Sequence, residues 1–515
     1  MKTKALYFSL LTLSFSLFFS CDKTTEKAVL IPEFIVSIEA TQNTNAPALQ
    51  SFTHGISGSE WLLFAGRTNQ SEDNGGLHDM RKNSDYSDES FPPTSFNENI
   101  SVYNPTTDAV PTSITITQMQ TIISEKFKSY NLDTIKKYTS VFRNTNALVK
   151  QVDDYLYIVG GYGPIDFTKP KKGYKTYNQV ARIHVPSLIQ LVKGNFAAVK
   201  ESKLFAFAQN KNLISTGGEL HHINGTFYLV GGHNFGKYAP NEGQKYVDAV
   251  YPFALSTSAA NPYVLSFFNG KPISDVADPK AISSDTLSAF RRRDGPITTS
   301  LYYNPLNQKI EESIAIYAGV FKPGEKVLAA WNDAIYVHPN YTTNEKKQYT
   351  YDQDYNQKNF NVYSCPSVVA FDASNKILHT FLLGGIGDGN TKKEVRLSGF
   401  TNTGTHIKLK VDGSPLKSTR TTFSNNLFAN NNTNEAPFYG AETLFFPSND
   451  LKTISESKDV IDTKSSFTGS TKNVNVGYVF GGIESFHSHP GTYGRTKSRA
   501  SNKVWKVTLT KQTIN

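Results

Sequence analysis

The chain has 515 residues and carries 53 Lys and Arg against 44 Asp and Glu, a formal net charge of +9. Hydrophobic residues make up 38% of it, which is enough for a large core and excludes a disordered protein. The excess charge is dispersed rather than gathered in a basic block, so the composition does not favour nucleic-acid binding. With only two cysteines, Cys21 and Cys365, a disulfide scaffold is also excluded. An aromatic content of 12%, 35 Gly and only 3 Met favour β-structure over helical bundles.

The N-terminus has the pattern of an export signal. Lys2 and Lys4 precede an apolar run over residues 5–19, which is too short to span a bilayer but fits the core of a signal peptide. The following Ser20-Cys21 resembles the end of a bacterial lipoprotein signal. We therefore expect a signal peptide at 1–20, a lipidated tether at 21–27 acylated on Cys21, and anchorage at the outer membrane facing the periplasm. A chance cysteine beside an ordinary signal-peptidase site is the alternative.

The next element is a β-like run from Val29 to Ile38, which stands before any repeated pattern. We expect it to complete the last sheet of the fold by pairing beside the C-terminal Val504–Val507 run.

A repeated unit then runs along the chain. Each copy has a short β-like run, a turn, and a second apolar run that ends in Gly-Gly or Ala-Gly. In one copy the turn is Asn224-Gly225, the strongest short-range signal of a β-hairpin. The second apolar runs of the six copies are Trp61–Gly66, Leu156–Gly161, Phe227–Gly232, Ile314–Gly319, Phe381–Gly385 and Val476–Gly482.

Six glycine-terminated hairpins resemble the kelch family of β-propellers, whose main signature is this diglycine. The resemblance implies an all-β, six-bladed propeller over 28–515. Its four-stranded blades would lie near 45–110, 140–190, 210–257, 295–340, 362–412 and 438–510, with 28–40 as the closing strand. The units average about 80 residues against about 50 for an ordinary kelch blade, so long loops must be inserted. Asn69–Asn99 is one such insertion, and Gln118–Tyr138 has the apolar spacing of a short helix.

Candidate site residues flank the first strand of each unit, because propeller sites generally lie on the central axis. A mixed polar set at these positions could bind a polar ligand, although water filling the channel would also account for it. We assign none of them a catalytic role. The channel candidates are His54, Glu219, Arg293, Asp294, Cys365 and Glu442, with Asn146 at the equivalent place in the second unit.

Metal and cofactor chemistry is weakly indicated. His487 and His489 would lie on the same side of an extended chain, but no third ligand can be assigned. If Cys21 is lipidated, Cys365 has no partner and is either buried and inert or a site residue. We predict no metal and no cofactor.

Two functions remain open from the sequence. Long insertions without a complete catalytic set favour a non-enzymatic interaction module. The chain also resembles exported propellers of Bacteroidota, which include the periplasmic plug of the type 9 secretion translocon. That resemblance implies docking to an outer-membrane protein or secretion-pore complex, with no nucleic acid and with membrane contact only through a lipid anchor. Alternatively, the channel charges resemble the acid, base and Arg groups of kelch-type sialic-acid epimerases, which implies an enzyme or binder acting on a sugar or another polar ligand.

Overall fold

The structure is a computed structural model that describes residues 32–68, 91–237, 243–277, 279, 288–320, 322, 330–341, 348–352, 355–357, 361, 363–387, 399–428, 435–488 and 498–513. The expected signal peptide, the tether with Cys21, residues 69–90 of the first insertion and His489 lie outside the described residues.

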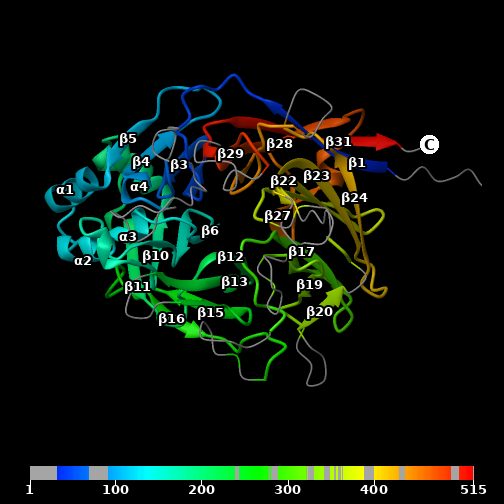
Figure 1. Cartoon of the computed structure of the whole chain (residues 1–515), viewed down its shortest axis with the longest axis horizontal. Helices are drawn as coiled ribbons and strands as arrows, with labels where there is room; N and C mark the ends of the chain where they lie inside the picture. The colour runs from blue at the N-terminus through cyan, green and yellow to red at the C-terminus, as the bar shows by residue number, and fades with distance from the viewer. Residues whose placement is uncertain are drawn as a thin grey trace, which may run out of the picture.

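Antiparallel sheets surround a central axis and form an all-β propeller with few helices (Figure 1). We name each sheet after its innermost strand. The simple four-stranded sheets follow the chain directly. The β2 sheet holds β2 (Thr53–Ser57), β3 (Glu60–Phe64), β4 (Asn99–Tyr103) and β5 (Thr112–Thr115); the β6 sheet holds β6 (Leu148–Val152), β7 (Tyr155–Val159), β10 (Gln179–His184) and β11 (Phe205–Gln209); the β17 sheet holds β17 (Ile297–Asn304), β18 (Lys309–Tyr317), β19 (Ala334–Val337) and β20 (Tyr349–Asp352).

Two sheets are larger, and strands distant in sequence extend them. The seven-stranded β12 sheet holds β12 (Thr216–Ile223), β13 (Thr226–Lys237), β15 (Tyr251–Ser256) and β16 (Ser266–Asn269), with β8 (Tyr162–Pro164), β9 (Tyr174–Thr176) and β14 (Gly243–Tyr246). The six-stranded β21 sheet holds β21 (Ser367–Asp372), β22 (Ile377–Gly387), β23 (Gly399–Lys410) and β24 (Ser418–Ser424), with β27 (Ser457–Asp462) and β26 (Thr453–Ile454).

The last four-stranded sheet joins the two ends of the described chain. The β25 sheet is ordered β25 (Leu444–Pro447), β28 (Asn473–Phe480), β31 (Val504–Thr513) and β1 (Pro32–Ala40). β1 runs antiparallel to β31 in continuous register from Pro32 opposite Thr513 to Ala40 opposite Trp505, so the early β-like run of the sequence does lie beside the C-terminal strand. Phe34 and Val36 of β1 are 1% and 3% exposed, because they pack into the core shared with the β21 sheet. A separate ribbon is formed by β29 (Ile483–Ser485) and β30 (Ser498–Ala500).

Each of the six hairpins expected from the sequence is an antiparallel strand pair in the structure, namely β2–β3, β6–β7, β12–β13, β17–β18, β21–β22 and β25–β28. The prediction of six regular four-stranded blades is confirmed only in part, because the fold is an all-β propeller but has five blades rather than six, and two of its sheets exceed four strands. The β21 sheet departs most, since β27 pairs in parallel with its innermost strand and removes the free inner edge of a regular blade.

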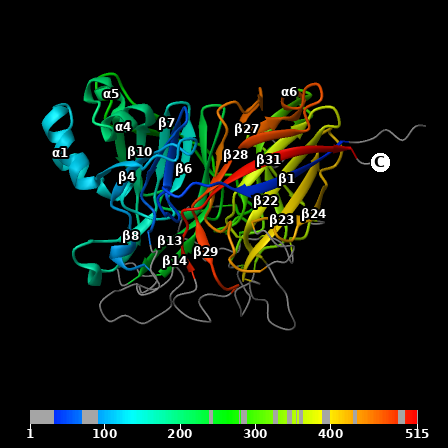
Figure 2. The ribbon, with the colours of Figure 1, turned by 90° about the horizontal axis from the view of Figure 1, so that it is seen from above.

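The helical insertion is part of the core rather than an appendage. α1 (Ile116–Lys126), α2 (Leu132–Lys137) and α3 (Thr139–Phe142) lie at the rim (Figures 1 and 2), and Thr115 and Gln118 form a capping box at the start of α1. Met119, Ile123 and Phe142 are fully buried against residues of the β2 and β6 sheets. The helix expected from the spacing at Gln118–Tyr138 is present, but removing it would open this core.

The remaining helices are short and cover strand ends: α4 (Val185–Val192), α5 (Glu201–Leu204), α6 (Thr463–Ser466) and the 3-10 turns η2 (Pro93–Ser95), η3 (Pro170–Lys172) and η4 (Phe196–Ala198). Among the described residues, no helix is both long and apolar enough to cross a membrane.

Candidate functional site

In five of the sheets, the glycine that ends the second strand is bonded to the chain that begins the next sheet. Gly160 and Gly161 both have left-handed backbones, with φ values of 69° and 90°. The Gly161 N–H donates to the carbonyl of Ser215, 3.0 Å away, and a Cβ on Gly160 would lie 2.0 Å from that same carbonyl oxygen. Glycine is therefore required by conformation and by space. Equivalent bonds run from Gly66 to Asn144, Gly232 to Arg292, Gly385 to Tyr439 and Gly482 to Leu49.

Just inside these bonds, the backbone forms a ring around the axis. Each sheet contributes one residue at or shortly before the start of its inner strand, and in five of the six sheets the N–H of this residue donates to the carbonyl of the corresponding residue in the preceding sheet. The bonds run from Asn146 to Ser51 (3.2 Å), Gly217 to Asn146 (3.2 Å), Asp294 to Gly217 (2.8 Å), Ser364 to Asp294 (2.5 Å) and Glu442 to Ser364 (3.1 Å). We call these six residues the axial ring.

The side chain of Glu442 links members of the axial ring to one another. The Glu442 carboxyl accepts hydrogen bonds from the Ser51 hydroxyl at 2.8 Å and from the Asn146 amide at 3.4 Å. Tyr363 also hydrogen-bonds to Glu442. Glu442 is 8% exposed, so this carboxyl connects sheets from opposite ends of the chain inside the protein.

Asp294 occupies a place that only a glycine neighbour allows. A Cβ on Gly217 would lie 2.2 Å from Asp294 Oδ1, and Gly217 also has a φ of 66°. On its other side, the Asp294 carboxyl is 3.3 Å from Nε of Arg293. The Arg293 guanidinium in turn lies 3.0 Å from Nε2 of His233.

Three carboxyl groups interact at this level, because Glu219 lies two residues beyond Gly217 on β12. Burial raises the pKa of Glu219 to about 8, with the charges of Glu442 and Asp294 adding to it and Lys150 opposing it. Burial and Asp294 raise the pKa of Glu442 to about 7, against the hydrogen bonds from Ser51 and Tyr363. Burial also raises the pKa of Asp294, opposed by Arg293. The group therefore holds protons near neutral pH and can act as hydrogen-bond donor as well as acceptor.

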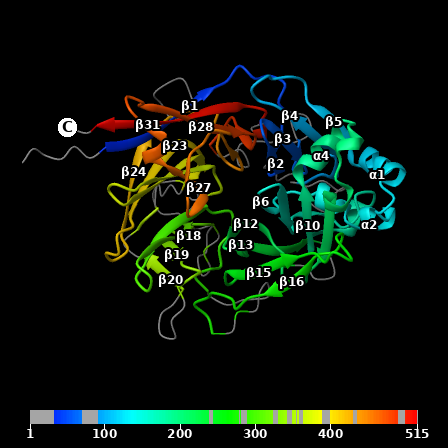
Figure 3. The ribbon, with the colours of Figure 1, turned by 180° about the vertical axis from the view of Figure 1, so that it is seen from behind.

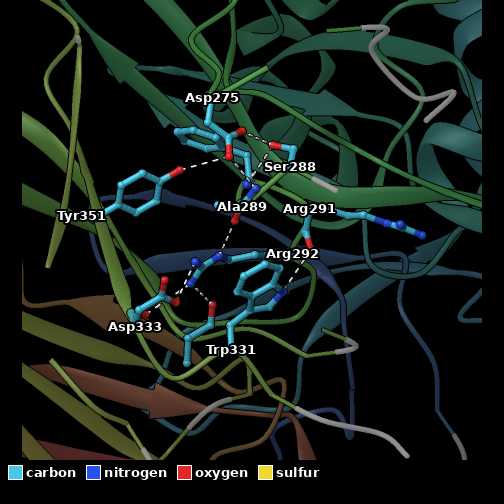
Figure 4. Close-up of polar contacts among 10 residues, drawn as sticks. Asp275, Ser288, Ala289, Arg291, Arg292, Trp331, Asp333 and Tyr351 are labelled. Atoms are coloured by element: carbon cyan, nitrogen blue, oxygen red, sulfur yellow. Dashed lines mark hydrogen bonds and ion pairs between the residues drawn. The ribbon is translucent and has the colours of Figure 1, made fainter. Parts of the chain in front are cut away.

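Figure 4 shows the contacts of Arg292, the residue that directly precedes Arg293 and Asp294. Arg292 is 1% exposed, and its guanidinium donates to the carbonyls of Ala289 (2.7 Å) and Ala318 (2.9 Å) and to the Asp333 carboxylate (2.8 Å). The guanidinium also lies 4.5 Å from the centre of the Trp331 ring. Of the three consecutive arginines in the sequence, this one is a buried structural anchor.

The segment that contains Arg292 is also held by Asp275. Its carboxylate accepts hydrogen bonds from the Ser288 hydroxyl (2.6 Å), the Ala289 N–H (2.9 Å) and the Tyr351 hydroxyl (3.1 Å), as Figure 4 shows. The segment before Asp294 is thus held by both the β12 and the β17 sheets.

The opposite end of the axis is crossed by β26 and β27. β27 pairs in parallel with β21, with Ala370 opposite Ile461. From there Lys458 reaches Asp153 (2.6 Å), at the turn after β6, and Asp459 pairs with Lys150 on β6. The β6 and β21 sheets are three sheets apart in the order of the ring, so they face each other across the axis. Figures 1 and 3 place β27 near the centre, toward β6, and Figure 2 shows β27 and α6 on the face opposite to β8, β14 and β29.

The structure separates the residues suggested by the sequence into two groups. Glu219, Arg293, Asp294 and Glu442 lie together at the axial ring, as does Asn146. Tyr363 and Ser51 were not among the candidates, although they lie four and two residues before the inner strands β21 and β2, which was the available signal.

His54 and Cys365 belong to packing instead. The His54 ring lies 4.7 Å from the Phe446 ring, and burial lowers its pKa to about 4. Burial raises the pKa of the Cys365 thiol to about 12, which fits an inert thiol packed against apolar core. Within the described residues, no group of three or more His, Cys, Asp or Glu is arranged to hold a metal ion.

A separate cavity of about 210 Å³ lies between the β17 and β21 sheets, away from the axial ring. Its walls include Tyr302, Tyr303, His338, Tyr341 and Lys410. None of these residues was among the site candidates from the sequence.

Comparisons with known proteins add little to this geometry. No family model and no curated protein matches the chain. Among solved structures, one described as the structure of YjhT is similar over 72% of this chain and 84% of its own, at 10% identity and a TM-score of 0.34. A likeness at that level carries no argument about function, and the propeller assignment rests on the sheets of this chain.

Proposed function

We propose that the chain is a non-enzymatic docking propeller of the kelch type. It is exported, anchored through Cys21 on the periplasmic side of the outer membrane, and binds an outer-membrane protein or secretion-pore complex that it plugs or gates. The observation that supports docking rather than catalysis is that chain segments are bonded across both ends of the central axis. Hydrogen bonds of the axial ring join the sheets at one end of the axis and the β26–β27 hairpin crosses the other, which favours the faces of the propeller as the surfaces for a partner.

The helical insertion is the surface that we propose for docking. Its buried side is fixed in the core, so its outer side is presented rigidly. That outer side carries more positive than negative charge, with Glu125 and Asp133 opposed by the exposed Lys126, Lys128, Lys136 and Lys137. A rigid basic face suits an acidic partner surface, and a stable interface of this kind buries about 1,200–2,000 Å² in total.

The test is charge reversal on the surface rather than deletion. The Lys126→Glu, Lys136→Glu, Lys137→Glu variant should lose co-purification with outer-membrane extracts while its thermal unfolding stays unchanged. The matched control reverses three exposed lysines of other sheets, Lys309→Glu, Lys503→Glu and Lys506→Glu, and should keep the partner. Equal retention by both variants would reject the helical insertion as the docking surface.

A second function is favoured by one observation, the shared upward pKa shift of the axial carboxyl groups. Perturbed acids gathered in one place are typical of functional sites. In this reading the axis binds a sugar or another polar ligand, with Glu219 as the accessible acid and Arg293 as the cationic partner. Calorimetric titration with a panel of sugars that includes sialic acid, comparing the wild-type chain with Glu219→Gln, distinguishes the two. Binding that disappears in Glu219→Gln, together with intact docking, would support the ligand site.

A further inference from the structure

We propose that the β26–β27 hairpin is a hinged plug, whose polar tip swings away from the β6 sheet and exposes the axis while its apolar base stays in place. The proposal does not depend on which of the two functions above holds.

The base of the hairpin is firmly held. Val460 and Ile461 are 0% and 1% exposed and belong to the cores of the β21 and β25 sheets. The Thr463 hydroxyl donates to the carbonyl of Phe371 at 2.9 Å, and the Asp462 side chain caps α6. Burying apolar side chains of this size stabilises the base by about 1.5–3 kcal/mol each, so this end does not leave the core.

The tip is held by weaker and more exposed contacts. The ion pair of Lys458 and Asp153 joins side chains that are 84% and 71% exposed, so solvent and salt screen it almost completely. The pair of Lys150 and Asp459 is less exposed, at 20% and 41%. Two hydrogen bonds add to them, from the buried Ser457 hydroxyl to Glu312 at 2.9 Å and from the Thr299 hydroxyl to Asp459 at 3.2 Å, and Ile454 of β26 is partly buried. The fully buried apolar contacts of β27 therefore end at Val460, and before it the strand is held by polar contacts, so we place the hinge there.

What the tip covers is polar and incompletely satisfied. Lys150, which holds Asp459, also acts electrostatically on His221 and Glu219. His221 is 8% exposed, and its Nε2 has no hydrogen-bond partner among the described residues. A buried polar atom without a partner costs free energy, and opening the tip would give this nitrogen access to water. Glu219 keeps some accessible surface, so space remains beside it for a reagent that passes the tip.

Thiol labelling measures the opening directly. In a Cys21→Ser chain, the Glu219→Cys variant places a reactive thiol between the axial ring and the hairpin, while the buried native Cys365 reports global unfolding. We expect slow maleimide labelling of the new thiol, accelerated about tenfold by Lys150→Met or by 1 M NaCl, with Cys365 unlabelled. The matched control is Lys193→Met, which removes the ion pair to Glu60 (2.9 Å) on another surface and should change nothing.

Two results of the labelling experiment would contradict the hinged hairpin. Labelling as fast in the native chain as in denaturant would mean that the hairpin covers nothing. A rate unchanged by both Lys150→Met and salt would mean that the tip is not held by these ion pairs. If Lys150→Met also exposes Cys365, the variant has lost global stability, and labelling of the Glu219→Cys chain at low and high salt is used instead. Faster labelling in 1 M NaCl, with Cys365 unlabelled, would support the plug, and an unchanged rate would mean that the hairpin is static.

Discussion

The hydroxyl of Ser51 donates a 2.8 Å hydrogen bond to the carboxyl group of Glu442, across 391 positions of sequence. Both residues have left-handed backbones, with φ values of 49° and 57°, and both lie two residues before the start of an inner strand. Five neighbouring pairs of the axial ring are joined by backbone bonds, and this side-chain bond joins the sixth pair, where the last sheet meets the first.

Removing that donor should weaken the closure. Ser51→Ala leaves a buried carboxyl without one of its partners, which costs about 1–3 kcal/mol of unfolding free energy. Chemical denaturation measures the loss. Ser455→Ala, which removes an exposed hydroxyl bonded to Glu456, is the control and should change stability by less than about 0.5 kcal/mol. Equal stability of both variants would contradict a role for the Ser51 bond.

The acid group at the ring makes stability depend on pH in a defined direction. In the folded chain the pKa of Glu219 is about 8 and that of Glu442 about 7, against 4.5 for an ordinary glutamate. Both carboxyl groups therefore keep a proton in the folded state at pH values where the unfolded state has lost it, and their contribution to stability is lost as pH rises through about 7 and 8. Buried histidines such as His54, with a pKa of about 4, act in the opposite direction below pH 6.5, so the fall belongs to the range above that pH. The melting temperature should drop between pH 6.5 and about 8, and Glu219→Gln should flatten the drop. A Glu219→Gln profile as steep as that of the native chain would show that another group is responsible.

Gly217 and Gly225 provide a matched pair of substitutions. Both have positive φ, 66° and 80°, but a Cβ at Gly225 meets nothing within 4 Å, whereas one at Gly217 meets the Asp294 carboxylate at 2.2 Å. Gly225→Ala should cost about 1 kcal/mol from backbone strain alone. Gly217→Ala should cost several kcal/mol and displace Asp294, which thermal unfolding and a crystal structure would detect. Equal costs at the two positions would mean that Asp294 moves freely.

Deleting residues 28–40 should strongly destabilise the chain. The deletion removes Phe34 and Val36 from the core and leaves the β31 edge unpaired. A deletion that ends before residue 28 should leave the melting temperature unchanged. If both deletions melt alike, β1 does not contribute to the closure.

Anchorage is tested by Cys21→Ser. This variant should leave the membrane fraction, because the only anchor that we predict is the lipid on Cys21. Fractionation at low and high salt separates lipid anchorage from attraction of the net charge of +9 to the membrane surface. A variant that stays on membranes in high salt would rule out the lipid anchor.

The sequence predicted the positions of strands and site residues where the same structural unit repeats, and it did not predict the parts that follow no repeat. The glycine pairs locate all six hairpins because their left-handed conformation is demanded at the same point of every unit. Positions just before the inner strands led to Asp294 and Glu442 for the same reason, since both have positive φ, and Glu219 was found because it lies near the start of β12. His54 and Cys365 stand at similar places in the chain, but their side chains pack into the protein rather than joining the ring.

The β26–β27 hairpin could not be foreseen in this way. Residues 453–462 contain few apolar side chains and follow no repeat, and their pairing depends on the free edge of β21, which is distant in sequence. The same pairing gives the β21 sheet six strands instead of the expected four and places the hairpin across the axis.

The axial ring also has a mechanical consequence. Its bonds all run in one direction around the axis, from each N–H to the carbonyl of the preceding sheet. Each sheet is bonded to both of its neighbours, so an outward force on one sheet also acts on the bonds to the sheets beside it. A partner that binds a single sheet at the rim and pulls on it therefore has to stretch bonds around the ring before that sheet can separate.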